Sequence, residues 1–438
     1  MNLILLSGGS GKRLWPLSND VRSKQFLKLF KRPDGEYESM VQRVFRQIKN
    51  VDSNAVVVIA TAKTQVSAIH NQLGNNVEIS IEPYRRDTFP AIALATAYLH
   101  YVKKIPEGEV VVVCPVDPYV QEDYFEALKL LNQQATKNEA NLVLMGIEPT
   151  HPSEKYGYII PQNPNGVSFV KTFKEKPDAK TAEKYINQGA LWNGGVFAYK
   201  LEYVLEKTRM FIDFIDYDDL FAKYDMFTKI SFDYAIVENE PSIQVMRYYG
   251  EWKDIGSWNT LTEVMSENTI GDVALDETCN GVHVINELGV PVLVMGLQNI
   301  IISVSPDGIL VSDKGQSEYL KNYVGKINRE VMYAEKSWGC FRVLDADKDS
   351  ITIKVTIKPG DSMNYHCHNH RNEVWVVVSG QGQTVIDGMK QFVNVGDVIT
   401  MQAGCRHTIF AVTELVLIEV QLGKDITVQD KEIFPLEV

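Results

Sequence analysis

The sequence lacks several features that would place it in other protein classes. No run of about 20 apolar residues occurs, so a membrane-spanning helix is not expected. The apolar run near the N-terminus is four residues long and follows no basic segment, which is unlike a signal peptide. The five cysteines are scattered and odd in number. This usage predicts a reduced, cytoplasmic protein without a disulfide framework.

Positive charge is also in deficit. The chain has 44 Lys and Arg against 56 Asp and Glu, which gives a formal net charge of −12. Nucleic-acid-binding proteins usually show a basic balance or a basic stripe, so neither nucleic acid nor a membrane is expected as a partner. A few local cations can still form a positive pocket for a small anion.

The order of apolar segments predicts an α/β domain over residues 1–268. Leu3–Leu6, Val56–Ile59, Val110–Val113 and Leu142–Met145 have the character of buried strands, and segments of helical periodicity lie between them. This alternation favours a Rossmann-like domain with a mixed, mostly parallel sheet covered on both faces. One of the intervening helices is expected to begin after Ser39.

Two smaller, β-rich domains are expected after the first. Over residues 269–335 helical patterns stop and short apolar runs recur, which fits a linker domain with a left-handed β-helix-like segment as one option. Residues 336–438 carry short, glycine-separated strands, with strict alternation over Ile351–Ile357. Evenly spaced short strands of this kind predict an all-β sandwich or barrel, and a jelly roll fits.

A glycine-rich loop follows the first strand. Gly8, Gly9 and Gly11 would let backbone N–H groups approach phosphate oxygens closely. Arg13 can bind a phosphate through two N–H groups, and Lys24 can supply a second cation. The loop is not a Walker A motif, because no Gly-Lys-Ser/Thr follows at the required spacing. A flexible strand-to-helix turn with solvated charges is the alternative interpretation.

This loop and the segments after it resemble the sugar-1-phosphate nucleotidyltransferases, and among them the mannose-1-phosphate guanylyltransferases. The similar segments occur in the family's order over residues 8–18, 23–27, 82–91, 115–117, 156–159, 173–177, 192–195, 231–235 and 252–258. Several ordered motifs are far more specific than any one of them. The resemblance implies a cytoplasmic enzyme that supplies precursors of surface polysaccharides.

The resemblance also implies which residues form the site. Nucleotide contacts are expected from Leu6, Gly8, Gly9, Gly11, Arg13, Lys24, Arg86, Asp87 and Thr88. Sugar-phosphate contacts are expected from Tyr156, Gly157, Glu175, Lys176, Asn193 and Gly195. The catalytic residues are expected to be Arg13, Lys24, Asp117 and Asp254, with Mg²⁺ held by the two aspartates. Taken alone, Asp117 also fits a turn, and Glu175 with Lys176 fits an exposed charge pair.

The implied reaction is attack of a sugar 1-phosphate oxygen on the α-phosphorus of a nucleoside triphosphate, with pyrophosphate leaving. Both reactants are anions, so a divalent cation and basic side chains would offset their repulsion. The phosphate nucleophile is already ionised at pH 7, so no general base is required, and positioning would supply most of the acceleration. GTP and mannose 1-phosphate are the expected substrates.

Four departures from the family pattern bear on the substrates. The family has Thr at Lys12, Pro at Ser23, Asn at Asp87 and, in most members, Ser at Gly194. Since Asp87 falls in the base-recognition segment and Gly194 in a sugar segment, another base or another sugar, such as a heptose 1-phosphate, stays open.

A second constellation of candidate ligands lies near the C-terminus. His366 and His368 are two residues apart, so in a strand they share a face, and Glu373 and His407 on neighbouring strands can complete a site. Imidazole and carboxylate together suit Zn, Mn, Fe, Co or Ni. The spacing of these residues and of the flanking glycines resembles the two motifs of cupins.

Bifunctional relatives of the guanylyltransferases end in a cupin that interconverts mannose 6-phosphate and fructose 6-phosphate. Those relatives have Gln at His366 and a longer C-terminal tail, and no phosphate-binding arginine is evident here from the sequence. Two hypotheses follow for the cupin: a metal-dependent isomerase, or a non-catalytic metal-binding module that stabilises the protein or a dimer. A homo-oligomer, a dimer, is the expected assembly.

Overall fold

The computed structural model describes residues 1–9, 11–19, 21–327, 331–424, 426 and 430–436. The chain separates into two units. The first comprises residues 1–10, 23–66 and 75–266, and the second comprises residues 11–22, 67–74 and 267–438.

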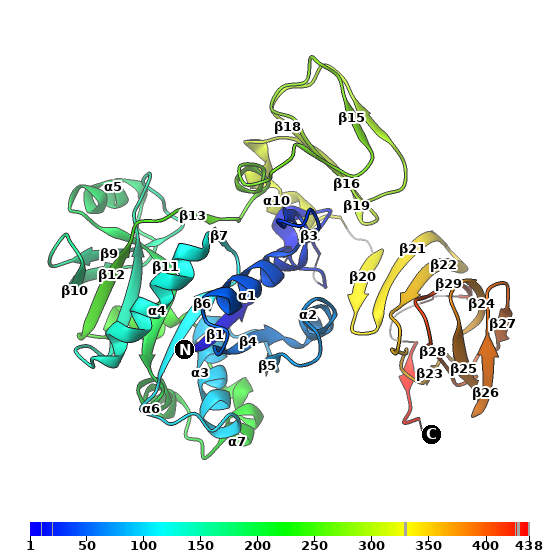
Figure 1. Cartoon of the computed structure of the whole chain (residues 1–438), viewed down its shortest axis with the longest axis horizontal. Helices are drawn as coiled ribbons and strands as arrows, with labels where there is room; N and C mark the ends of the chain where they lie inside the picture. Colours follow the sequence, from blue (N-terminus) through cyan, green and yellow to red (C-terminus); the bar gives the residue numbers. More distant parts are fainter. Residues whose placement is uncertain (10, 20, 328–330, 425, 427–429, 437–438) are drawn as a thin grey trace. The chain divides into compact units, whose positions relative to one another are not determined.

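The first unit is built on a nine-stranded mixed sheet of order β5-β4-β1-β6-β11-β8-β12-β10-β9 (Figure 1). The four strands β5, β4, β1 and β6 run parallel, and β11 joins them antiparallel. The strands are β1 (Asn2–Ser7), β4 (Val56–Ala62), β5 (Glu78–Glu82), β6 (Val110–Pro115), β8 (Leu142–Ile147), β9 (Gly157–Pro161), β10 (Val167–Lys174), β11 (Leu191–Lys200) and β12 (Ile243–Tyr248).

Helices bury both faces of this sheet. Ile4 on β1 belongs to a core cluster with residues of helix α3, while its neighbours Leu3 and Leu5, also fully buried, point to the opposite face. On that face α1 and α4 lie side by side (Figure 1). The helices are α1 (Met40–Val51), α3 (Thr88–Ala97), α4 (Glu122–Thr136), α5 (Ala179–Asn187), α6 (Leu201–Phe211), α7 (Tyr217–Ala222), α8 (Phe232–Ala235) and α9 (Trp258–Thr262).

Local sequence explains where these helices begin. The Ser39 hydroxyl accepts a hydrogen bond from the Gln42 backbone N–H, and the Gln42 side chain accepts one from the Ser39 N–H, so a capping box starts α1 as predicted. Two short ribbons complete the unit, β2 (Phe30–Lys31) with β3 (Tyr37–Glu38), and β7 (Pro118–Val120) with β13 (Trp252–Asp254).

The middle of the second unit is a small β-helix-like segment. Strands β14, β16 and β18 stack in parallel, and β15 and β17 form a second parallel stack, with Val284 and Val304 in a shared core. The strands are β14 (Thr269–Ile270), β15 (Val273–Leu275), β16 (His283–Asn286), β17 (Val292–Val294), β18 (Ile300–Ser305) and β19 (Gly308–Asp313), and α10 (Lys321–Val324) follows. Residues 11–22 and helix α2 (Val66–Leu73) also belong largely to this unit.

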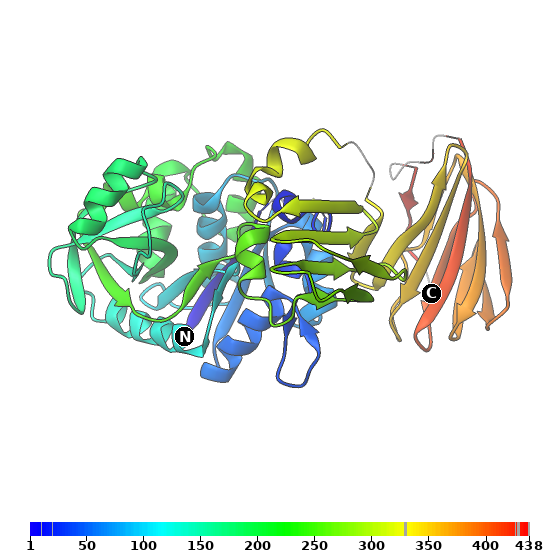
Figure 2. The ribbon, with the colours of Figure 1, turned by 90° about the horizontal axis from the view of Figure 1, so that it is seen from above.

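The C-terminal part is a two-sheet β-barrel, drawn in yellow to red in Figure 2. The six-stranded sheet has the order β20-β21-β22-β29-β24-β27 and the five-stranded sheet β26-β25-β28-β23-β30. The strands are β20 (Tyr333–Lys336), β21 (Gly339–Asp347), β22 (Ser350–Ile357), β23 (His366–Cys367), β24 (Arg371–Ser379), β25 (Gly382–Ile386), β26 (Met389–Val393), β27 (Val398–Met401), β28 (His407–Ala411), β29 (Leu415–Gly423) and β30 (Glu432–Ile433). The predicted combination of an α/β domain with a C-terminal all-β jelly roll is confirmed.

Candidate active site and candidate metal centre

A cavity of about 340 Å³ lies in the first unit, where the carboxyl ends of four parallel strands meet. In open α/β sheets this edge is where ligands bind. Leu6, Gly8 and Gly9, which are among the predicted nucleotide contacts, line it from the end of β1. The other lining residues are Ala60, Ala62, Gln65, Glu82, Arg85, Asp87, Thr88, Ala91, Pro115, Asp117 and Lys229.

Three carboxyl groups line this cavity, those of Glu82, Asp87 and Asp117, and the first two are held by hydrogen bonds. Asp87 precedes α3 with a φ of 72°, a backbone conformation uncommon for residues with a side chain, and its Oδ1 accepts a hydrogen bond from the Thr88 N–H at 2.8 Å. Glu82 accepts a hydrogen bond from the Tyr224 hydroxyl at 2.9 Å, and burial raises the pKa of the Glu82 carboxyl. Both groups therefore have fixed positions on the cavity wall.

The two arginines of this segment have different surroundings. Arg85 lines the cavity, whereas the Arg86 guanidinium donates a hydrogen bond to the Asp225 carbonyl at 3.0 Å. Lys229 supplies a second cation to the lining. No motif identifies Arg85 or Lys229 in the sequence, because each reaches the cavity through tertiary packing. Thr88 lines the cavity, and its hydroxyl accepts a hydrogen bond from the Phe232 N–H at 2.8 Å.

The two candidate metal-binding aspartates are brought together by the ribbon of β7 and β13. Asp117 immediately precedes β7, and Asp254 at the end of β13 pairs with Pro118. The ammonium of Lys24 lies 2.9 Å from Asp117 Oδ2 and 3.7 Å from Asp254 Oδ1, and it donates a hydrogen bond to the Ile255 carbonyl at 2.8 Å. Two carboxylates around one cation are the hard oxygen donors that Mg²⁺ prefers, so the residues fit this ion.

An aromatic cluster stands beside the aspartates. The Tyr156 ring lies 4.7 Å from that of Trp192 and 5.5 Å from that of Trp252, the residue that begins β13. Burial, with the charges of Asp254 and Asp117, raises the pKa of the Tyr156 phenol well above its usual range. The charges of both carboxylates therefore contribute to the raised pKa of Tyr156.

The predicted sugar-phosphate residues converge where β9, β10 and β11 meet. Asn193 on β11 pairs with Gly157 on β9, and Glu175 follows β10. A Cβ on Gly157 would lie 2.5 Å from Oε2 of Glu175, so a side chain at this position would require the carboxylate to shift. Lys176, at a φ of 45°, pairs with the carboxylate of Glu175, which is 6% exposed.

Asn193 links this group to the segment 231–235. Its Nδ2 donates to Oδ1 of Asp233 at 2.6 Å, and its Oδ1 accepts from the Gly195 N–H at 3.1 Å. Burial, and secondarily the nearby Glu175, raise the pKa of Asp233 to about 6. Asn193, Gly195 and Asp233 are therefore joined by hydrogen bonds into one polar group in the first unit.

Arg13 and Gly11 lie in the second unit, in a short helix over Gly11–Leu14, and the Arg13 side chain is exposed. Arg22 in the same segment forms a two-point ion pair with Glu287, at 2.9 Å for each N–O distance.

The second candidate site lies inside the C-terminal barrel. His366 on β23 pairs with His407 on β28, and the ligand atoms of His366, His368 and His407 lie within 4.8 Å of one another. Glu373 reaches the group from β24 of the other sheet, 3.1 Å from His368 Nε2 and 3.2 Å from His407 Nε2. The four side chains are 2–3% exposed.

The three imidazoles are oriented by main-chain carbonyls. His366 Nδ1 contacts the Asn364 carbonyl at 2.6 Å, His407 Nδ1 contacts the Cys405 carbonyl at 3.0 Å, and His368 Nδ1 contacts the Asp430 carbonyl. Only a protonated Nδ1 can donate to a carbonyl, so each Nε2 keeps its lone pair for the centre of the group.

This geometry fits a transition metal. Burial lowers the pKa of His366 to about 2 and that of His368 to about 4, so both imidazoles are neutral at pH 7, as metal ligands must be. Within the described part of the chain, Glu373 Oε2 and His407 Nε2 are buried without a hydrogen bond of acceptable geometry. Such atoms are normally satisfied, and one cation between them would satisfy both.

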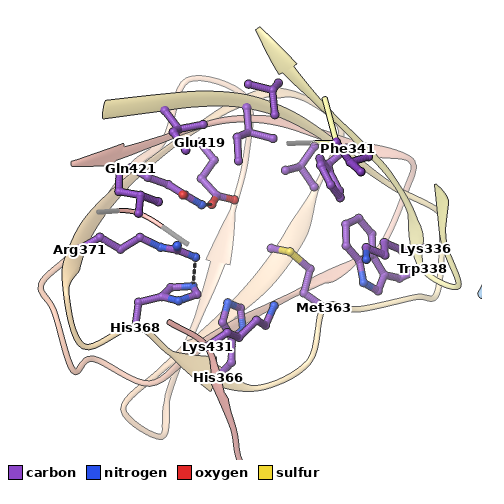
Figure 3. A pocket seen from close by; sticks show the side chains of 16 residues that line it. Lys336, Trp338, Phe341, Met363, His366, His368, Arg371, Glu419, Gln421 and Lys431 are labelled. Carbon is purple, nitrogen blue, oxygen red and sulfur yellow. Dashed lines mark hydrogen bonds between the residues drawn. The ribbon is translucent and has the colours of Figure 1, made fainter. Parts of the chain in front are cut away.

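A cavity of about 340 Å³ opens onto this group (Figure 3). Trp338, Phe341 and Met363 form an apolar side, and His366 and His368 line the polar side. Its charged or polar residues are Lys336, Arg371, Glu419, Gln421 and Lys431. Burial, and secondarily Glu373, raise the pKa of Glu419 to about 8.

Sequence reasoning missed the polar lining of this cavity. Arg371 is two residues before Glu373 on β24, so both point inward, and this spacing was visible in the sequence. The same holds for Glu419 and Gln421 on β29. Lys431 carried no such signal, since it follows the last long strand and returns to the cavity through the pairing of β30 with β23.

Comparison with known proteins defines the class to which the first unit belongs. The family model described as nucleotidyl transferase matches residues 2–270, more than half of the chain. The chain therefore belongs to the nucleotidyl transferase family, and it is a nucleotidyltransferase. A second model, described as mannose-6-phosphate isomerase C-terminal, matches residues 325–436, which include the whole barrel site.

Two relatives match most of the chain. A putative mannose-1-phosphate guanylyltransferase of Vibrio cholerae is 30% identical over 98% of this chain and 98% of its own length. The xanthan biosynthesis protein XanB of Xanthomonas campestris is 30% identical over 87% of this chain and 86% of its own.

A crystal structure from Thermus thermophilus, described as a mannose-1-phosphate geranyltransferase, has a TM-score of 0.62 at 26% identity. It covers 74% of this chain and 98% of that chain. Within the described ranges, no helix has both the length and the apolar character needed to cross a membrane.

Proposed function

We propose that this nucleotidyltransferase transfers GMP from GTP to mannose 1-phosphate, releasing pyrophosphate and forming GDP-mannose. The observation that carries the proposal is the convergence of Lys24 and Asp254 on Asp117, which lines the cavity formed by the parallel strand ends. Mg²⁺ bound by the two aspartates would supply charge neutralisation for the two anionic reactants.

The chemistry of the cavity wall supports guanine as the base. Ionised carboxylates only accept hydrogen bonds, and guanine offers donors at N1–H and the 2-amino group. Glu82 and Asp87 provide two such acceptors, while Arg85 and Lys229 can donate to the O6 acceptor or to phosphate. Adenine has an acceptor at N1, which an ionised carboxylate would repel.

The residues of this chain have distinct roles in the proposal. Gly8 and Gly9 would leave room for phosphate next to the backbone, and Lys24 would offset the charge of the pyrophosphate. Asn193, Glu175 and Lys176, with Tyr156, Gly157 and Gly195, would orient the sugar phosphate. Names of relatives such as the Vibrio protein support mannose 1-phosphate as the acceptor.

The test of this proposal is product analysis by mass spectrometry after incubation with GTP, mannose 1-phosphate and Mg²⁺. We expect GDP-mannose and pyrophosphate in equal amounts. A folded protein that forms no GDP-mannose would exclude the proposed substrates, and a heptose 1-phosphate or another nucleotide would then be tested.

A second function is favoured for the barrel: metal-assisted isomerisation of mannose 6-phosphate and fructose 6-phosphate. The cavity beside the four candidate ligands holds basic residues for a phosphate, together with the carboxyl group of Glu419 for proton transfer. When bound, Zn, Mn, Fe, Co or Ni would polarise the sugar carbonyl.

A coupled assay of full-length protein with each metal tests isomerisation. Conversion of mannose 6-phosphate is the expected result. Absence of conversion with all five metals would leave a metal-binding module that stabilises the protein.

We further propose three domains, over residues 1–268, 269–335 and 336–438, in a dimeric cytoplasmic protein. All five cysteines are free thiols, which suits a reducing compartment.

A patch of apolar side chains that are 62–73% exposed lies on or beside the edge strands β26 and β27: Met389, Phe392, Val395 and Val398. In a dimer, a second copy covering this patch would remove the apolar surface from water. Light scattering during size-exclusion chromatography tests this assembly. A wild-type protein with the mass of a monomer, and the same mass for Phe392→Glu, would contradict it.

A further inference from the structure

Arg371 lies at the junction of the candidate metal centre and the barrel cavity. Its side chain is 8% exposed and lines the cavity, on the same strand face as Glu373. A guanidinium that is this deeply buried needs partners on its N–H groups, because an unpaired buried charge is costly. The partners that it takes here are therefore informative.

Two of these partners are candidate metal ligands. The Arg371 Nη2 donates to His368 Nε2 at 3.1 Å, the contact drawn as a dashed line in Figure 3. The Nε donates to Glu373 Oε1 at 3.3 Å. His368 Nδ1 is committed to the Asp430 carbonyl, so Nε2 is the lone pair that the imidazole offers to either partner.

A metal ion and Arg371 thus compete for His368 Nε2, and both would contact the carboxylate of Glu373. A lone pair of Nε2 that is bound to a metal cannot also accept a hydrogen bond from Nη2, and two cations at one carboxylate repel each other. Metal binding would therefore release at least one N–H group of Arg371. The open volume next to the guanidinium is the cavity, where Lys336 and Lys431 supply further positive charge.

We propose that Arg371 couples the metal centre to an anion subsite in the barrel cavity: metal binding frees its guanidinium from His368, and the freed N–H groups bind a phosphate group. The proposal rests on the metal site proposed above. It makes Arg371 a residue that senses metal occupancy and confers affinity for an anion, whether or not the barrel catalyses isomerisation.

Coupling of this kind has two opposite consequences for one substitution. Replacing Arg371 removes a competitor for His368 and Glu373, so metal affinity should rise. The same replacement removes the anion-binding group, so phosphate affinity of the metal-loaded protein should fall. A residue with a merely structural role would lower metal affinity and thermal stability together.

The experiment is isothermal titration of full-length, chelator-treated protein with Zn²⁺ and then with inorganic phosphate. We expect Arg371→Gln to bind Zn²⁺ at least about threefold more tightly than the wild type. Phosphate should bind the wild type at least about fivefold more tightly with Zn²⁺ than without it, the range typical of coupled sites. In Arg371→Gln this metal dependence should be reduced to the part due to direct contact of phosphate with the ion.

Controls separate the possible failures. Arg342→Gln, on strand β21 of the same sheet and outside the cavity lining, should match the wild type in both titrations. No heat of Zn²⁺ binding in the wild type would reject the metal site itself. Weaker Zn²⁺ binding in Arg371→Gln, or phosphate binding that ignores the metal in the wild type, would overturn the coupling. If Arg371→Gln fails to fold, Arg371→Lys and the wild-type phosphate titrations decide the question.

Discussion

The ammonium nitrogen of Lys24 lies 2.9 Å from Oδ2 of Asp117, on the edge of the cavity formed by the parallel strands. The contact joins the first residue of the short helix Lys24–Phe26 to the residue that immediately precedes β7. Because Asp254 also approaches the same ammonium, at 3.7 Å, the site places two carboxylates around one positive charge. This arrangement is the basis of the first prediction.

Removing one of these carboxylates should abolish transfer without unfolding the protein. We expect Asp254→Asn to lower kcat by about 10²–10³-fold, comparable to loss of a group that stabilises transition-state charge. Its melting temperature should stay close to that of the wild type, because the side chain is 29% exposed. Asp218→Asn, an exposed aspartate on α7, is the matched control and should have wild-type activity. Wild-type turnover in Asp254→Asn would contradict the assigned role.

Replacing Asp87 should weaken recognition of the base. Alanine at this position removes both the acceptor for the Thr88 N–H and the acceptor that the side chain offers to the base. We expect Asp87→Ala to lower kcat/KM for GTP by about 10-fold or more, a cost of about 1–3 kcal/mol, and to narrow the preference for GTP over ATP. Steady-state kinetics with both nucleotides measure this. An unchanged GTP-to-ATP ratio would move base recognition to Glu82.

A methyl group on Gly157 should disturb sugar-phosphate binding. Its Cβ would meet Oε2 of Glu175 at 2.5 Å, so the carboxylate must move away from Lys176 and Asn193. We expect Gly157→Ala to raise KM for the sugar 1-phosphate more than KM for the nucleotide. Gly108→Ala is the control, since a Cβ there has nothing within 4 Å. Equal effects on the two KM values would point to a general loss of structure.

The stability contributed by Asp233 should depend on pH. Its folded-state pKa, about 6, lies above the ordinary 3.8, so its stabilising effect is complete below 3.8 and is lost as pH rises through 6. Between pH 8 and pH 5 this amounts to about 1 kcal/mol. Asp233→Asn should therefore gain more stability relative to the wild type at pH 8 than at pH 5. Denaturant unfolding at both pH values measures the difference, and a gain independent of pH would contradict it.

Loss of a barrel ligand should affect metal binding and stability but not nucleotidyl transfer. We expect His366→Ala to bind Zn²⁺ more weakly and to lose the metal-dependent rise in melting temperature. A ligand at about 100 times its Kd stabilises a fold by about 2.7 kcal/mol, which a thermal scan detects. His151→Ala, an exposed histidine in the first unit, is the control. Unchanged Zn²⁺ affinity in His366→Ala would remove this residue from the ligand set.

Local patterns predicted the elements better than they predicted the cavities. Ser39 predicted the start of α1, and strict alternation over Ile351–Ile357 predicted β22. Caps and periodicity depend only on residues that are close in sequence. The antiparallel placement of β11 between β6 and β8 had no such signal, since pairing across the sheet is decided by tertiary packing.

The same distinction explains the site residues. The candidate ligands His366, His368 and Glu373 lie within eight residues of one another on predicted strands. Their convergence could therefore be expected from the sequence. Arg85 and Lys229 lie 144 residues apart in sequence (229 − 85) and meet only at the folded cavity. The spacing of Arg371 and Glu373 could have predicted that Arg371 points into the barrel. Its proposed role depends on two hydrogen bonds that are seen only in the folded barrel.

The most direct test of the central claim is pyrophosphate release in the presence of Mg²⁺, with the common nucleoside triphosphates crossed against a panel of sugar 1-phosphates. The proposed function predicts release with GTP and mannose 1-phosphate, and loss of that release in Asp254→Asn. Release with another pair would keep the reaction class but change the substrates, with Asp87 and Gly194 as the residues to test. No release with any pair, from folded and metal-loaded protein, would contradict the account.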